Sequence, residues 1–255
     1  RRKAPGLEER LIAIERFLSI RGAEHCSLPR VDTHGHETWQ QFAEQYGGQA
    51  VVLTGLARPA AARAWKREAL LEAYGPVQVR ANNGRFDGTR SRQATSIEAY
   101  LQHNASDANV FLVEREVRAV LGAEQAAEEV PPLLRDFDYR PIFSLGVAGS
   151  PTFSHKHQET WLSLQVGRKA WWLGRNASSK PRSARLPPGG DPCLALPASW
   201  EEFDRKAALR DFDLCVQHPG EVMYFGNMTR HATCNLDSYV LAFGAQGRTE
   251  WQPPL

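Results

Sequence analysis

Residues 153–173 read FSHKHQETWLSLQVGRKAWWL, and this stretch decides what kind of fold the chain can adopt. His155 and His157 stand two positions apart in a segment that is typical of a β-strand. Because successive side chains of a strand point to opposite faces, both imidazoles can reach one metal ion. Glu159 and Trp161 continue the same face if the strand is unbroken.

A third histidine lies far downstream, in the stretch PGEVMYFGNMTRHATCNLD at residues 219–237. His231 opens a short strand-like segment behind a turn in which Gly220 fits the positive φ of a type II turn. Two ligands from one strand and a third from a neighbouring strand are how a small barrel holds a metal ion, with positions left open for water or substrate. The sequence therefore predicts a metal site made of His155, His157 and His231.

The composition is that of an ordinary folded protein. The 255 residues are 42% hydrophobic and 24% charged, with a formal net charge of +2. This balance gives no electrostatic footprint for DNA or RNA, so we expect no nucleic-acid partner. We also expect no membrane span, because no apolar run approaches the roughly 20 residues that a spanning helix needs.

Hydrophobic periodicity divides the chain into a mainly helical first part and a strand-rich second part. Leu7, Leu11, Ile14 and Leu18 form an apolar stripe at helical spacing. Further helices are expected from about His36 to Tyr46, from Pro59 to Tyr74, from about Ser96 to Leu101 and after Ser199. Short strands are expected around residues 50–53, 77–79, 110–113, 142–145, 153–173, 212–217, 222–225, 231–235 and 239–243. The pattern predicts a mostly β fold with flanking helices, of the α+β class.

The two histidine blocks resemble those of the JmjC family, which is cupin-like. There a histidine pair precedes an aromatic residue and a Gly-x-Lys-x-aromatic strand, here Gly167, Lys169 and Trp171, and a second block carries His-x-x-x-Asn-Leu-Asp after a Pro-Gly-Glu turn. The resemblance implies a double-stranded β-helix (a jelly-roll or cupin barrel) with an N-terminal helical elaboration. On this basis we expect an N-terminal extension at residues 1–25 and a single domain at 26–255, with the barrel core at about 141–245.

The resemblance also implies roles for individual residues. Enzymes of this family use Fe(II) and 2-oxoglutarate to activate O₂ and oxidise a C–H bond of a substrate. His155 and His231 would be metal ligands, and Lys169 would anchor the distal carboxylate of 2-oxoglutarate, unless it is an ordinary surface lysine. Asn235 is expected to belong to the cofactor-binding residues, where it would orient the histidine strand or the pocket and not touch the metal.

The sequence departs from the enzyme pattern at two positions. His157 stands where active hydroxylases present Asp or Glu, so either His157 is a neutral third ligand or Glu159 supplies the carboxylate. Leu162 stands where many relatives place an Asn that binds the cosubstrate. The leading hypothesis is an oxygenase that acts on a protein or peptide. The alternatives are a catalytically silent binding or scaffold protein of the secretory pathway, and a three-histidine dioxygenase or isomerase that acts on a small molecule.

Cysteines and glycosylation motifs bear on the cellular compartment. The pattern of the chain is most similar to that of a family member in the lumen of the endoplasmic reticulum, which has cysteines at the positions of Cys26 and Cys215. A disulfide between these two is therefore a hypothesis for an oxidising compartment. Asn104 and Asn176 are candidate glycosylation sites in Asn-x-Ser motifs. We expect a location in the endoplasmic reticulum lumen or secretory pathway, with the cytoplasm as the alternative, and the sequence gives no oligomeric state.

Overall fold

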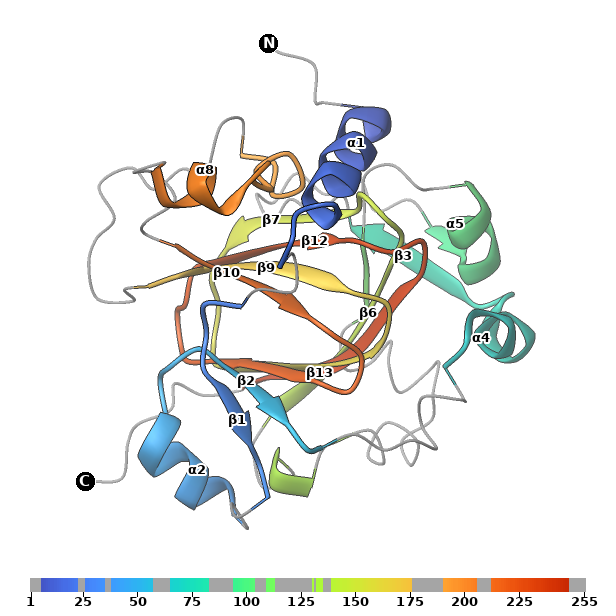
Figure 1. Cartoon of the computed structure of the whole chain (residues 1–255). Coiled ribbons are helices and arrows are strands. Elements are labelled where there is room, and N and C mark those ends of the chain that lie inside the picture. The colour runs from blue at the N-terminus through green and yellow to red at the C-terminus, as the bar shows by residue number, and fades with distance from the viewer. Residues whose placement is uncertain are drawn as a thin grey trace.

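Two β-sheets form the body of the protein and curve around a shared interior, with helices outside them (Figure 1). The computed structural model describes residues 6–22, 26–34, 38–56, 65–82, 94–103, 109–112, 130, 132–134, 139–175, 190–205 and 212–247. The predicted fold class, mostly β with flanking helices, is confirmed.

The strands and helices follow one another along the chain. The strands are β1 (Arg30–Asp32), β2 (Val51–Thr54), β3 (Gln78–Asn82), β4 (Ala94–Ser96), β5 (Asn109–Leu112), β6 (Tyr139–Gly146), β7 (Pro151–His155), β8 (Thr160–Val166), β9 (Lys169–Gly174), β10 (Phe212–Gln217), β11 (Val222–Phe225), β12 (His231–Asn235) and β13 (Val240–Gly247). The α-helices are α1 (Leu7–Leu18), α2 (Trp39–Tyr46), α4 (Arg67–Tyr74), α5 (Ile97–His103) and α8 (Trp200–Arg205), and a 3₁₀ helix spans Pro132–Leu134.

The order of the strands is that of a jelly-roll barrel. In the described part of the chain, the larger sheet has the order β1-β2-β11-β8-β13-β6-β5-β3-β4 and the smaller sheet the order β10-β9-β12-β7. From β6 to β13 the chain passes repeatedly from one sheet to the other, and neighbouring strands in this part pair antiparallel. Only the pair β1–β2 is parallel among the described strands. The two sheets thereby enclose one interior.

Alternation along the strands separates an inner from an outer set of side chains. In β8, Leu162 and Leu164 point into the barrel, whereas Trp161 packs on the outer face of the larger sheet. In β11, Met223 and Phe225 point inward. The inner apolar cluster of buried residues is Leu28, Val52, Leu162, Leu164, Trp171, Leu173, Cys215, Met223, Phe225, Val240 and Ala242. The barrel interior is therefore filled by side chains from both sheets.

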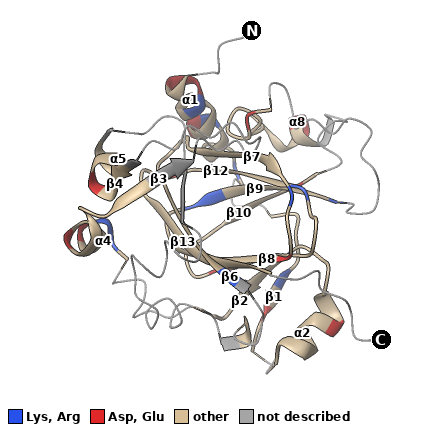
Figure 2. Ribbon diagram, turned by 180° about the vertical axis from the view of Figure 1, so that it is seen from behind, with Lys and Arg blue, Asp and Glu red and all other residues tan. Residues whose placement is uncertain are grey.

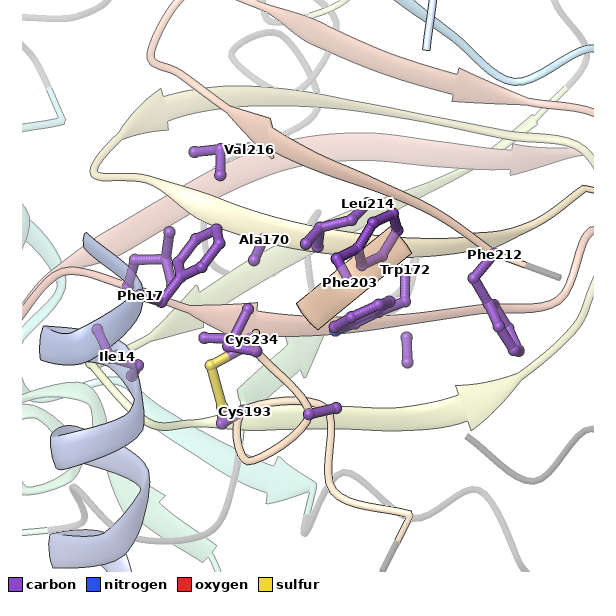
Figure 3. Close-up of a cluster of buried hydrophobic side chains, with 14 residues drawn as sticks. Ile14, Phe17, Ala170, Trp172, Cys193, Phe203, Phe212, Leu214, Val216 and Cys234 are labelled. Carbon is purple, nitrogen blue, oxygen red and sulfur yellow. A yellow bond between two sulfur atoms is a disulfide. The ribbon is translucent and has the colours of Figure 1, made fainter. Parts of the chain in front are cut away.

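The outer face of the smaller sheet is covered by α1 and by residues around α8. Trp172 and Leu214 of the sheet pack there with Ile14 and Phe17 of α1 and with Phe203 of α8 (Figure 3). The outer face of the larger sheet is covered at one end by α2 and at the other by α4 and α5. Each sheet is therefore packed on both faces, against the barrel interior on one side and against helices on the other.

Serine side chains cap the start of two helices. Ser96 Oγ accepts a hydrogen bond from the amide of Ala99 at the start of α5, and Ser199 Oγ accepts one from the amide of Glu202 in α8. Helix α2 begins at Trp39, three residues later than expected, because Thr38 and Gln41 form a capping box there.

Helix α1 buries a different face from the one expected. The buried residues are Arg10, Ala13, Ile14 and Phe17, whereas Leu11 is 40% exposed. The expected stripe was wrong in its centre because the polar residue Arg10 lies inside: its Nε atom forms a 2.8 Å ion pair with Asp191. Phe17 lies on the same buried side of the helix and packs against the smaller sheet.

Two disulfide bonds tie outer segments to the smaller sheet. Cys26 is bonded to Cys215 in β10, and Cys193 is bonded to Cys234 in β12. The second bond was not predicted from the sequence; it holds the segment around Cys193 against the strand that carries His231 (Figure 3).

Two predictions concern other parts of the chain. The candidate glycosylation residues Asn104 and Asn176 lie outside the described residues. None of the helices that the structure describes is both long and apolar enough to cross a membrane.

Candidate metal centre

Three imidazoles meet at one end of the barrel. His155 is the last residue of β7, His231 is the first residue of β12, and the two are paired across these strands. His157 lies just past the end of β7. The ring centroids are 4.2 Å apart for His155 and His231, 4.6 Å for His157 and His231, and 5.1 Å for His155 and His157. One ligand atom from each residue lies within 4.8 Å of the others, so the three rings can share an ion.

The backbone that carries His157 differs from the strand that the sequence predicted. An unbroken strand would carry His155, His157, Glu159 and Trp161 on one face. Instead β7 ends at His155, and residues 156–159 form an irregular bend before β8 begins in the other sheet. The bend keeps His157 beside the other two rings, while Trp161 faces the outside of the barrel.

The hydrogen bonds of the three rings fix which nitrogen faces the shared point. The Nδ1 atoms of His155, His157 and His231 lie 2.8, 2.8 and 2.9 Å from the backbone oxygens of Phe153, Gln158 and Thr229. A carbonyl oxygen can only accept, so each Nδ1 carries the proton and donates it. Each Nε2 therefore keeps its lone pair, which is the arrangement that metal-binding histidines have.

Burial keeps these histidines neutral. Desolvation, followed by the neighbouring ring of His157, lowers the pKa of His155 to about 4. Desolvation also lowers the pKa of His157, and it lowers that of His231 far below its usual value, with the other two imidazoles adding to the effect. Neutral rings near pH 7 can bind a metal ion without first losing a proton.

The donor set fits a divalent transition metal. Three neutral nitrogens suit iron, cobalt, nickel, copper or zinc, whereas calcium and magnesium prefer oxygen ligands. Three ligands on one side of an ion leave positions open for other molecules.

Glu159 does not join the three histidines. It is 2% exposed, and its carboxylate accepts a hydrogen bond from the Tyr224 hydroxyl. Tyr224 belongs to the cluster on the outer face of the larger sheet, away from the barrel interior. Burial raises the pKa of Glu159. The group of described residues that can hold a metal contains His155, His157 and His231 and no carboxylate.

A cavity leads from the histidines into the barrel. Its empty space, including the part open to solvent, is about 350 Å³. The lining residues are Ile142, Thr152, His155, His157, Thr160, Leu162, Lys169, Trp171, Phe225, His231 and Thr233. The lining thus combines the three histidines, one lysine and three threonines with four apolar side chains.

Lys169 is the cation of this cavity. It is 1% exposed, so it is not a surface lysine. The strands of both sheets are mostly tan in Figure 2, so charged residues are few along them. The Nζ atom of Lys169 donates a 3.2 Å hydrogen bond to the Ser144 hydroxyl, and no ion pair to Lys169 is found in the described part of the chain. Desolvation lowers the pKa of Lys169 to about 7. A buried amine with a neutral partner favours an anionic ligand.

Two residues at or next to the cavity, Thr233 and Gln217, were not predicted from the sequence. The Thr233 hydroxyl is buried and has no hydrogen-bond partner among the described residues. Gln217, also buried, accepts a 2.8 Å hydrogen bond from the Trp171 indole and donates to the backbone oxygens of Leu162 and Glu221. Gln217 thereby fixes two walls of the cavity. Thr233 follows His231 at the spacing of one strand face, a signal that could have indicated it.

Asn235 lies deeper along the same strand. It follows Thr233 by two positions in β12, is fully buried, and is paired with Lys169 across β9. It is absent from the cavity lining, and its backbone bonds to Ser150 and Gly149. Leu162, in contrast, lines the cavity directly.

The sequence is similar to those of two proteins that share one name. JmjC domain-containing protein 8 of Mus musculus is 27% identical in an alignment over 235 residues, and the match covers 85% of this chain and 81% of that protein. The protein of the same name from Homo sapiens is 25% identical in an alignment over 233 residues, and the match covers 85% of this chain and 82% of that protein. No family model matches the sequence.

A solved structure shares the fold. It is that of YcfD, a ribosomal oxygenase from Escherichia coli, in complex with cobalt and succinic acid. The TM-score is 0.51 at 17% identity, over 84% of this chain and 52% of the YcfD chain, so this chain spans about half of that protein. The resemblance to the JmjC proteins that the histidine motifs indicated is therefore confirmed: by sequence the chain is a relative of JmjC domain-containing protein 8, and by fold it is a cupin-like barrel.

Proposed function

We propose that this chain is a metal-dependent oxygenase of the JmjC type, which uses Fe(II) and 2-oxoglutarate to hydroxylate a protein or peptide. The observation that carries the proposal is the combination of three Nε2 lone pairs and one buried ammonium in a single cavity. In the reaction, substrate C–H, O₂ and 2-oxoglutarate give substrate C–OH, succinate and CO₂.

We assign metal binding to the three histidines and cosubstrate binding to Lys169 and Thr233. His155, His157 and His231 would hold the iron, which when bound supplies the activation of O₂ coupled to decarboxylation of the cosubstrate. Lys169 would bind the distal carboxylate of 2-oxoglutarate through a charge-assisted hydrogen bond, and Thr233 would offer its unused hydroxyl to the same ligand. Asn235 would hold β12 in place behind Lys169.

The apolar walls would orient the cosubstrate and exclude water. Leu162, Ile142, Trp171 and Phe225 are the apolar residues of the lining, and the ring centroid of Phe225 lies 4.4 Å from that of His231. The Trp171 ring is fixed by its hydrogen bond to Gln217. Such walls strengthen the electrostatic attraction between Lys169 and a carboxylate, because little water remains to screen it.

A protein substrate and a lumenal location are part of this proposal. YcfD is described as a ribosomal oxygenase, and a protein substrate for this chain follows by analogy of fold. Two disulfides favour an oxidising compartment such as the endoplasmic reticulum lumen.

Succinate release tests the proposal directly. Purified protein is incubated with Fe(II), O₂ and 2-oxoglutarate, with and without candidate peptides, and succinate is measured. We expect release that depends on added Fe(II) and is lost in Lys169→Met. No release together with no detectable 2-oxoglutarate binding would overturn the enzymatic proposal.

A second candidate is a catalytically silent binding protein with the same barrel. The observation that favours it is the donor set without a carboxylate, together with Leu162 in the cavity wall. The variant His157→Asp distinguishes the two: turnover gained by the variant and absent in the unsubstituted chain would support the silent protein, whereas turnover lost on substitution would support an enzyme with three histidines.

A further inference from the structure

One short loop holds two of the three histidines. Residues 226–229, here called the 226–229 loop, form most of the connection 226–230 between β11 and β12. The amide of Met228 donates a 2.7 Å hydrogen bond to the backbone oxygen of His157. The backbone oxygen of Thr229 accepts the Nδ1 proton of His231 at 2.9 Å. The position of His157 and the ring orientation of His231 therefore depend on adjacent residues of the same loop.

The loop has an unusual backbone conformation. Met228 has a φ of 59°, and it is the one residue other than glycine with a positive φ in the part of the chain that the structure describes. The backbone of an L-residue other than glycine rarely adopts this conformation, and a side chain branched at Cβ makes it less favourable still. The Met228 side chain is 39% exposed, so its packing does not explain why the backbone is held in this way.

Packing from outside the barrel holds the loop in place. Gly226 lies so close to the turn after α2 that a Cβ atom on it would come 2.4 Å from Cα of Gly48. Any side chain at position 226 would push the 226–229 loop away from that turn. The loop is thus packed between the turn at Gly48 on one side and the histidines on the other.

We propose that Met228 is a positioning residue, whose left-handed backbone sets the relative orientation of His157 and His231 and thereby the geometry of a bound metal. The inference rests on the proposed metal site and deepens it. Hydrogen-bond partners of metal-binding histidines set ligand orientation, and their loss commonly lowers metal affinity by about 10- to 100-fold.

Substitutions at Met228 separate backbone from side chain. Glycine adopts a positive φ freely, leucine keeps the exposed apolar side chain, and valine disfavours the conformation because it is branched at Cβ. We expect Met228→Gly and Met228→Leu to bind Co²⁺ as the unsubstituted chain does. Met228→Val and Gly226→Ala should weaken Co²⁺ binding about tenfold.

The readout is the absorption spectrum of bound Co²⁺ together with its dissociation constant, and circular dichroism reports whether each variant is folded. A changed visible band in folded Met228→Val or Gly226→Ala, with an unchanged band in Met228→Gly, supports the proposal. An unchanged band and affinity in both of the former variants would overturn it and leave the proposed function intact. If Met228→Val does not fold, Gly226→Ala decides. Absence of Co²⁺ binding by the unsubstituted chain would overturn both proposals.

Discussion

At the scale of single residues, the buried ammonium of Lys169 makes ligand binding depend on pH. In the free protein desolvation lowers the pKa of Lys169 to about 7, and a bound carboxylate stabilises the charged form and raises that pKa. Binding of 2-oxoglutarate therefore takes up a proton above pH 7. The affinity should be constant below about pH 6 and should fall above pH 7, by up to about tenfold per pH unit.

Calorimetric titration from pH 6 to 9, in buffers with different ionisation enthalpies, measures both the affinity and the proton uptake. Lys169→Arg is the matched control, because a guanidinium stays charged throughout this range and should remove the pH dependence. An affinity of the unsubstituted chain that does not change between pH 6 and 9 would contradict the assignment of Lys169 as the anion-binding group.

Thr233 gives a second prediction at this scale. Its hydroxyl is buried without a partner among the described residues, so Thr233→Val removes no hydrogen bond from the free protein. The thermal stability should stay unchanged or rise slightly. The affinity for 2-oxoglutarate should fall about tenfold, because a hydrogen bond to a charged carboxylate is lost, while Co²⁺ affinity remains. Equal 2-oxoglutarate affinity in the two proteins would exclude Thr233 from the ligand site.

Site residues in motifs of fixed spacing could be predicted from the sequence, and site residues outside such motifs could not. The three histidines and Lys169 stand in motifs with fixed spacing, and the structure brings all four to one cavity. Thr233 and Gln217 have no such motif. Their importance comes from burial and from cross-strand neighbours, which depend on how the two sheets meet.

At the scale of the elements, helix α1 shows that an apolar residue in a helix is not always a core residue. Phe17 is fully buried against the smaller sheet, whereas Leu11 is 40% exposed. We expect Phe17→Ala to lower the free energy of unfolding by about 3–5 kcal/mol, as large-to-small changes in a packed core do. Leu11→Ala, the matched control in the same helix, should change it by less than about 1 kcal/mol.

Urea unfolding followed by circular dichroism measures both variants. Equal losses of stability would mean that α1 packs with the face expected from the spacing of its leucines. That spacing was misleading because it gives no weight to Arg10, and the ion pair of Arg10 with Asp191, 181 residues away, is not visible in local sequence.

The bend at residues 156–159 illustrates the same limit. An alternating pattern predicts a strand, and nothing in it marks where the chain leaves one sheet for the other. Because β7 and β8 belong to different sheets, the strand breaks after His155, and Glu159 falls on the opposite side of the sheet from His157.

At the scale of the whole molecule, the two disulfides should contribute unequally to stability. Cys26–Cys215 closes a separation of 189 residues and Cys193–Cys234 one of 41. A chain-entropy model gives about 5 and about 4 kcal/mol for loops of these lengths. Thermal unfolding of the double variants Cys26→Ser/Cys215→Ser and Cys193→Ser/Cys234→Ser checks the order. A larger loss from the second pair would show that β12 depends on its tether more than loop entropy explains.

The fold class followed from the sequence because strand patterns and a shared motif order agree over the second half of the chain. The second disulfide did not, since four cysteines allow three pairings and only folding decides among them. The jelly-roll arrangement is what brings residue 155 next to residue 231.

X-ray absorption spectroscopy of the protein loaded with one equivalent of Co²⁺ tests the metal centre most directly, because outer-shell scattering counts the imidazoles bound to the ion. The structure predicts three imidazole ligands in the unsubstituted chain and two in His157→Ala. A spectrum with fewer than three imidazoles in the unsubstituted chain, or one that His157→Ala leaves unchanged, would contradict a shared site of His155, His157 and His231.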